Sequence, residues 1–206
     1  MNACANAMFS TREAAAALGA GHLGADAPVL GVGTDSRHVE RGSLFVALRG
    51  ERFDGHEFVA GALASGATAA MVDGQADVGR WPGASLVVVE DTKAGLGELA
   101  RWWRSRFALP AIGVVGSNGK TTTKEMTASV LTAQYGAVDV LATVGNLNND
   151  IGLPLTVLRL RAHHRAAVLE LGMNHPGETA TLAAIAQPTV ALITNAQREH
   201  QEFMKS

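Results

Sequence analysis

The 206-residue sequence has little cysteine, no excess of charge of one sign and no long apolar segment. Its single cysteine, Cys4, has no partner for an internal disulfide, which favours a reducing compartment. The formal net charge is −2 and the isoelectric point is near 6.4. Because nucleic-acid-binding proteins normally carry a basic stripe, we expect no nucleic-acid partner.

Signals for export and membrane insertion are missing as well. Residues 1–9 lack the basic start and apolar run of a secretory signal. No segment approaches the length of apolar sequence that spans a bilayer. We therefore expect a cytoplasmic protein with no membrane insertion. The sequence also contains no internal repeat and no low-complexity tract.

The composition present is typical of a soluble α/β protein, with 47% hydrophobic residues, 17% charged residues and 23 glycines. Apolar strands alternate with helices that begin at capping residues or end at glycines. The predicted strands are 29–34, 43–48, 68–72, 85–90, 111–115, 137–142, 166–171 and 189–194. The predicted helices are 10–19, 56–65, 92–107, 120–135, a short helix broken by Pro154, and one after Pro176.

Pro110 marks a change of organisation. We expect an α/β fold with a small N-terminal α/β domain over residues 1–108, followed by a P-loop mononucleotide-binding domain over 109–206. The regular alternation in the second domain predicts a mostly parallel sheet with its ligand site at the carboxyl ends of the strands. Residues 195–206 begin a polar, helix-prone segment that stops without a cap. We therefore expect this domain to be incomplete at its C-terminus.

The most informative motif follows the strand at 111–115. Gly116 and Gly119 flank a loop whose backbone N–H groups can point at an anion, and the loop runs into a helix N-terminus that favours phosphate. Lys120 can reach phosphate oxygens, and the Thr121 hydroxyl can ligate Mg²⁺. The candidate ATP-binding residues are Gly116, Ser117, Asn118, Gly119, Lys120, Thr121 and Thr122.

The motif departs from the usual P-loop at one position. Val114 stands five positions before Gly119, where the first glycine is usually found. An ordinary Gly-rich turn with a surface lysine is the alternative interpretation. We favour ATP binding because strand, loop, Lys-Thr pair and helix coincide.

Several polar residues near other predicted strand ends are further candidates. Glu170 ends an apolar strand, where a metal ion would offset the cost of burying a carboxylate, although a solvated strand-end charge is possible. Asn148 and Asn149 follow another strand and form either a ligand site or a polar turn. His200 could ligate a metal or bind phosphate, or could lie in solvent.

The first domain offers one candidate pair. Ser36 and Arg37 lie just after the strand at 29–34. A hydroxyl and a guanidinium together can hold a phosphorylated ligand. The alternative is an ordinary strand exit with a surface arginine.

Together, these segments resemble the Mur ligase family. Residues 34–37 (TDSR) and 42–56 (GSLFVALRGERFDGH) are similar to its UDP-binding N-terminal domain. Residues 116–126 (GSNGKTTTKEM) are similar to its ATP loop, which accounts for the missing first glycine. Residues 145–154 (GNLNNDIGLP) and 170–178 (ELGMNHPGE) resemble the member that acts on D-alanyl-D-alanine.

The resemblance implies a reaction and its cofactors. ATP would phosphorylate the terminal carboxylate of UDP-N-acetylmuramoyl-tripeptide, and the amine of D-alanyl-D-alanine would displace the phosphate, with Mg²⁺ assisting. The enzyme is expected to be a monomer. The resemblance implies that the catalytic residues are Lys120, Glu170 and His200, that the metal ligands are Thr121, Glu170 and His200, and that the substrate-binding residues are Ser36, Arg37, Asn148 and Asn149.

The sequence also departs from the family. Members have a third, C-terminal domain and a lysine after the histidine segment, and neither is present within the 206 residues. We therefore expect a ligase fragment with little or no turnover by itself. Two other hypotheses stay open at this point: a phosphotransferase that uses the same ATP loop, and a non-catalytic module that binds nucleotide and UDP-sugar.

Overall fold

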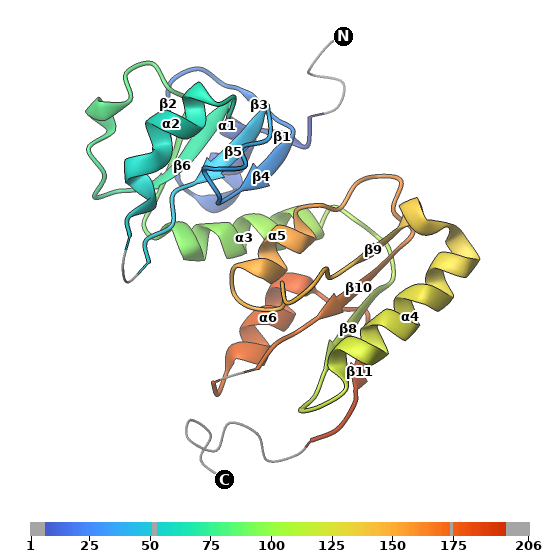
Figure 1. Cartoon of the computed structure of the whole chain (residues 1–206). Helices are drawn as coiled ribbons and strands as arrows, with labels where there is room; N and C mark the ends of the chain where they lie inside the picture. Colours follow the sequence, from blue (N-terminus) through green and yellow to red (C-terminus); the bar gives the residue numbers. More distant parts are fainter. Residues whose placement is uncertain (1–6, 51–52, 174, 197–206) are drawn as a thin grey trace. The chain divides into compact units, whose positions relative to one another are not determined.

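The computed structural model describes residues 7–50, 53–173 and 175–196 (Figure 1). The chain divides into two compact units, residues 1–99 and 100–206. Each unit holds its own β-sheet. Among the described residues, none of the helices combines the length and the apolar character that a membrane span requires.

The division between the units falls inside helix α3 (Thr92–Arg104), whereas the sequence analysis placed it after residue 108. Side chains in the last turn of α3 explain this difference. The indole of Trp103 donates to the carbonyl of Leu160 at 3.1 Å, and the buried guanidinium of Arg104 donates to the carbonyl of Ala186 at 3.0 Å. The last turn of α3 is therefore held by the second unit.

The first unit contains a five-stranded sheet with the order β2-β7-β6-β5-β4, in which β2 alone pairs antiparallel. A separate pair, β1 and β3, is antiparallel. The elements are β1 (Phe9–Ser10), α1 (Thr11–Leu18), β2 (Gly21–Leu23), β3 (Pro28–Val29), β4 (Gly31–Gly33), β5 (Ser43–Val46), the 3₁₀ helix η2 (Gly55–Phe58), α2 (Val59–Ala64), β6 (Ala69–Asp73), the 3₁₀ helix η3 (Val78–Arg80), β7 (Leu86–Val89) and the start of α3.

Two expectations for the first unit need correction. The predicted strand 29–34 is split at Leu30, because its first part pairs with β1 and its second part with β5. The edge strand β2 was not predicted. By contrast, the capping box at α1 is confirmed: Ser10 and Glu13 exchange side-chain-to-backbone hydrogen bonds, and Gly19 ends the helix with φ +60°.

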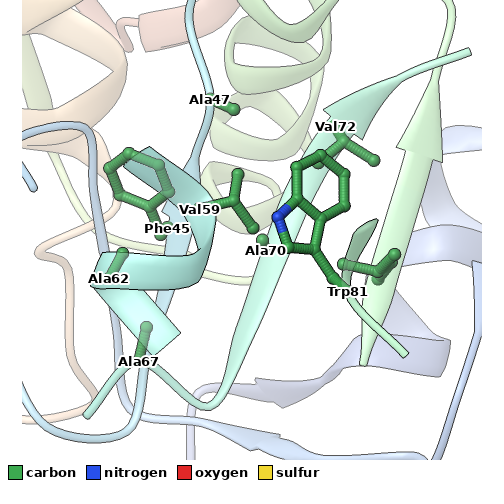
Figure 2. Packing of buried hydrophobic residues seen from close by; sticks show 9 residues of the cluster. Phe45, Ala47, Val59, Ala62, Ala67, Ala70, Val72 and Trp81 are labelled. Atoms are coloured by element: carbon green, nitrogen blue, oxygen red, sulfur yellow. The ribbon is translucent and has the colours of Figure 1, made fainter. Parts of the chain in front are cut away.

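The core of the first unit lies between its sheet and α2. Figure 2 shows the Trp81 indole near Ala70 and Val72, with Val59 between the indole and Phe45. Both β5 and β6 are buried along their whole length, which explains why they are apolar except at Ser43 and Asp73. The cluster comprises Phe45, Ala47, Val59, Ala62, Ala67, Ala70, Val72, Trp81 and Leu86.

The second unit has a four-stranded, fully parallel sheet with the order β11-β8-β10-β9, which confirms the predicted topology class. Helix α4 lies along one side of this sheet, and α5 and α6 lie along the other (Figure 1). The elements are β8 (Ala111–Val115), α4 (Lys120–Tyr135), the 3₁₀ helix η4 (Ala137–Asp139), β9 (Val140–Ala142), α5 (Gly152–Val157), β10 (Ala166–Glu170), α6 (Glu178–Ala186) and β11 (Val190–Ile193).

Pro154 does not break α5, contrary to expectation. It is the third residue of the helix, where its missing N–H would have no intrahelical acceptor. The helix therefore continues to Val157. Since all four strands run in the same direction, the loops after them gather at one edge of the sheet, and this edge carries the candidate site.

Candidate nucleotide-binding site

The loop between β8 and α4 needs both of its glycines. Gly116 has φ +136°, and a Cβ there would lie 2.1 Å from the Thr194 hydroxyl, since β11 ends directly beside the loop. Gly119 has φ +80° and forms the N-cap of α4. Among the described residues, no side chain caps this helix. The first-turn N–H groups of α4, which lack intrahelical acceptors, are therefore suited to an anion.

Lys120 is held over the loop. Its ammonium donates to the carbonyls of Gly116 at 2.6 Å and Ser117 at 3.2 Å. The Asn118 N–H donates to the side-chain oxygen of Asn195 at 2.9 Å. The Ser117 N–H donates to the backbone carbonyl of Asn195 at 3.3 Å. These two N–H groups, which the sequence motif directs at an anion, face the end of β11 in this structure.

Glu170 is the buried carboxylate of the site. It lies at the end of β10 and is 2% exposed, so it is not the solvated strand-end charge considered as an alternative. Its Oε1 accepts from the Thr121 hydroxyl at 3.3 Å and from the Asn148 amide at 2.9 Å. Its Oε2 is buried and has no hydrogen-bond partner among the described residues. A cation bound at Oε2 would satisfy this oxygen.

A second layer of contacts holds Glu170 in place. The Thr143 hydroxyl, just after β9, accepts from the Glu170 N–H at 3.0 Å. The ammonium of Lys124, 1% exposed, donates to the Thr143 carbonyl at 2.9 Å and also contacts the Glu125 carboxylate. These hydrogen bonds connect helix α4 to the carboxyl ends of β9 and β10 around the Glu170 carboxylate.

The two asparagines predicted as substrate ligands have different surroundings. Asn148 contacts Glu170, as described above. The Asn149 side chain accepts from the N–H groups of Ile151 at 3.2 Å and Gly152 at 2.7 Å, and so supports the start of α5. Asn149 also borders a cavity of about 470 Å³. The other lining residues are Asp150, Gly172, Pro176, Gly177, Glu178, Thr181 and Leu182.

Arg37, a candidate in the first unit, is paired within its own turn. Its guanidinium donates to both carboxylate oxygens of Asp35, at 2.9 and 2.8 Å, and these bonds hold the pKa of Asp35 well below its usual range. Ser36 lies half-buried in the same turn. A small cavity of about 70 Å³ adjoins this turn, and its lining includes Gly33, Asp35, His38, Glu40 and Ser43.

Thr122 and His200 are the remaining candidate residues of the second unit. Thr122 lies exposed in the first turn of α4. His200 lies outside the described residues, so its predicted metal role stays a prediction. Over the part of the chain that is described, no cluster of three or more His, Cys, Asp or Glu side chains is arranged to hold a metal ion.

The structure thus brings together Lys120, Thr121, Asn148 and Glu170 at one edge of the second sheet. Sequence reasoning missed Lys124, Thr143 and the pair Thr194–Asn195. The available signal for Thr143, Thr194 and Asn195 was a polar residue just after an apolar strand, and for Lys124 it was a position one helical turn after Lys120. A parallel sheet with this loop and a buried acid on the neighbouring strand defines a P-loop nucleotide-binding protein.

Family models narrow this class. Residues 28–104 match the model described as Mur ligase family, catalytic domain, and residues 114–206 match the Mur ligase middle domain. The chain belongs to the Mur ligase family.

Curated relatives agree with this assignment. The chain is 45% identical over 179 residues to the UDP-N-acetylmuramoyl-tripeptide–D-alanyl-D-alanine ligase of Escherichia coli, and the match covers 87% of this chain and 38% of that protein. It is 46% identical over 174 residues to the ligase of the same name from Haemophilus influenzae, covering 83% and 37%. The chain therefore spans less than two fifths of the length of these relatives.

Solved structures show the same likeness. A crystal structure of MurF from Acinetobacter baumannii matches with a TM-score of 0.83 at 40% identity, over 94% of this chain and 42% of that chain. MurF ligase from Thermotoga maritima in complex with ADP matches with a TM-score of 0.69 at 36% identity, over 80% and 37%.

Proposed function

We propose that this chain supplies the ATP-binding and UDP-sugar-binding parts of an amide ligase of peptidoglycan precursor synthesis. The ligase joins D-alanyl-D-alanine to UDP-N-acetylmuramoyl-tripeptide through an acyl phosphate, in the cytoplasm and as a monomer. The names of the relatives support the substrates. The edge of the second sheet supports the use of ATP.

The observation that carries this proposal is the surroundings of Glu170: its Oε2 is buried with no partner among the described residues, and its Oε1 accepts from the Thr121 hydroxyl. Oxygen donors of this kind suit Mg²⁺, which usually binds one or two protein oxygens together with substrate phosphates. Glu170 and Thr121 would hold the ion. When bound, Mg²⁺ offsets the negative charge of the transferring phosphoryl group.

The chain's own residues would position the nucleotide. Lys120 already lies over the loop, where its ammonium can meet phosphate oxygens. The first-turn N–H groups of α4 add further donors. Asn148 holds Glu170 in place through its amide. The ADP complex of the Thermotoga maritima relative gives independent support for a nucleotide in this family.

The first unit would bind the UDP-sugar. Arg37 is exposed and presents a planar cation, and Ser36 adds a hydroxyl. A diphosphate could take the place of the Asp35 carboxylate on the guanidinium, because both ligands suit its fork of donors.

Calorimetric titration tests the two binding functions separately. The wild-type chain should bind Mg·ATP and UDP-N-acetylmuramoyl-tripeptide. Lys120→Ala should weaken Mg·ATP binding about 10- to 100-fold, because a charge-assisted contact contributes about 1.5–3 kcal/mol. The affinity for UDP-sugar should stay unchanged, since Lys120 belongs to the other unit. Unchanged ATP affinity in the variant would contradict the proposal.

Product analysis separates a ligase from a phosphotransferase. With ATP, tripeptide substrate and D-alanyl-D-alanine present, any ADP formed should be matched by free phosphate and a new amide. Mass spectrometry of the peptide product measures this directly. A stable phosphorylated product without an amide would support the phosphotransferase instead.

A further inference from the structure

Thr194 and Asn195, the two residues after β11, are attached to the phosphate loop. The Thr194 hydroxyl donates to the Asn118 carbonyl at 2.6 Å, and its N–H donates to the Val115 carbonyl at 2.9 Å. Asn195 accepts from the N–H groups of Ser117 and Asn118, as described above. The contacts join positions 76 to 79 residues apart in the sequence, so β11 must be docked beside β8 before they can form.

The hydrogen bonds of Asn195 continue through the peptide groups to Lys120. In a trans peptide the C=O and the N–H point in opposite directions. The peptide joining Gly116 to Ser117 donates its N–H to Asn195 and offers its carbonyl to the Lys120 ammonium. The next peptide, from Ser117 to Asn118, does the same. Asn195 therefore orients the two carbonyls that hold the ammonium.

The third peptide of the loop has the opposite orientation. Because the Thr194 hydroxyl binds the Asn118 carbonyl, this carbonyl faces the end of β11. The N–H of Gly119, which belongs to the same peptide, then points away from β11. This is the side on which Lys120 lies, and it continues into the first-turn N–H groups of α4, which have no side-chain cap among the described residues.

We propose that Thr194 and Asn195 are positioning residues for the phosphate loop. They fix the orientations of its first three peptide groups, so that the Lys120 ammonium and the Gly119 N–H lie on the same side of the loop before a phosphate binds there. This inference rests on the proposed binding of nucleotide phosphates at Gly119 and Lys120. A prearranged loop loses less conformational entropy on binding and so binds more tightly.

Matched substitutions test this role by calorimetry with Mg·ADP. Thr194→Ala and Asn195→Ala should each weaken binding about 5- to 10-fold, which corresponds to the loss of about one hydrogen bond. Thr194→Ser keeps the hydroxyl and should bind within about twofold of the wild type.

Thr189→Ala is the control for general loosening of β11. The Thr189 hydroxyl accepts from the Ala111 N–H at 3.0 Å, at the opposite end of the same strand pair. Its loss should lower the melting temperature as much as the Thr194 change does and leave Mg·ADP affinity within about twofold of the wild type. Equal weakening by Thr189→Ala would show that β11 acts only through stability and would overturn the inference.

A double-mutant cycle with Lys120 gives the sharpest readout. If Asn195 acts by orienting the carbonyls that hold Lys120, Asn195→Ala should have a much smaller effect in a Lys120→Ala background. Additive effects, or tighter binding by Asn195→Ala, would contradict the positioning role. Absence of Mg·ADP binding by the wild-type chain would instead contradict the proposed function itself.

Discussion

At the scale of single residues, the two loop glycines differ in what surrounds them. A Cβ at Gly116 would lie 2.1 Å from the Thr194 hydroxyl and 2.9 Å from the Asn195 carbonyl. A Cβ at Gly119 would have no heavy atom within 4 Å among the described residues. Both have positive φ, so both resist other side chains, but Gly116 alone also meets a steric conflict.

This contrast predicts unequal costs for the same substitution. Gly119→Ala should lower the free energy of unfolding by about 1 kcal/mol, the cost of the left-handed backbone conformation. Gly116→Ala should lower it by about 2–3 kcal/mol, because the end of β11 must also move. Urea denaturation measures both. Equal losses of unfolding free energy in the two variants would mean that the residues after β11 cause no steric conflict at Gly116.

Glu170 is the second residue whose surroundings make a prediction. Glu170→Gln removes the charge and keeps the shape. Mg²⁺ should then no longer strengthen ATP binding, so titrations with Mg²⁺ and with EDTA should give similar affinities. The melting temperature should stay the same or rise, because the substitution removes a buried negative charge, which is costly without a bound cation. A variant that keeps its full Mg²⁺ dependence would exclude Glu170 as a metal ligand.

At the scale of elements, an ion-pair cluster holds the segment between β5 and η2 to β6. The Arg49 guanidinium donates to Asp73 at 2.6 Å and contacts Asp54 at 2.9 Å. The buried His56 ring contacts Asp54 at 2.6 Å and accepts from the Asp73 N–H at 3.1 Å. The hydrogen bond from Arg49 is the main reason that the pKa of Asp73 lies below its ordinary value of 3.8.

The lowered pKa predicts how the stability of the first unit depends on pH. A carboxyl group with a lower pKa in the folded state stabilises the fold above its unfolded pKa, and this contribution disappears as pH falls through the folded pKa. Stability should therefore fall below about pH 4. Arg49→Met should return the pKa of Asp73 toward 3.8 and flatten this fall. Urea denaturation between about pH 2 and 6 measures this fall in the wild type and the variant. The same pH profile in both would contradict the role of Arg49 in lowering the pKa of Asp73.

Helices and strands could be predicted where the local sequence pattern was strong. Which strands pair with one another could not be predicted. The capping box at Ser10 and the strand at 111–115 were predicted directly from the sequence. The edge strand β2 was missed because three residues, Gly21–Leu23, carry no periodic pattern, and their pairing with β7 alone makes them a strand. The split at Leu30 likewise depends on which strands lie on either side.

At the scale of the whole molecule, the same limit applies to the candidate site. Glu170 could be predicted because an acid at the end of an apolar strand is unusual. The part played by Thr194 and Asn195 could not, because the order β11-β8-β10-β9 places the last strand beside the first. Chain order alone does not reveal that arrangement. The positioning contacts are therefore a property of the assembled sheet.

The proposed function requires that nucleotide phosphates bind at the start of α4 with a metal ion at Glu170. A crystal structure of the chain with Mg²⁺ and a non-hydrolysable ATP analogue tests this most directly. We expect phosphate oxygens on Lys120 and the Gly119 N–H, and an ion about 2.1 Å from Glu170 Oε2 and the Thr121 hydroxyl. An analogue bound away from this loop, or an ion that does not contact Glu170, would contradict the proposed function.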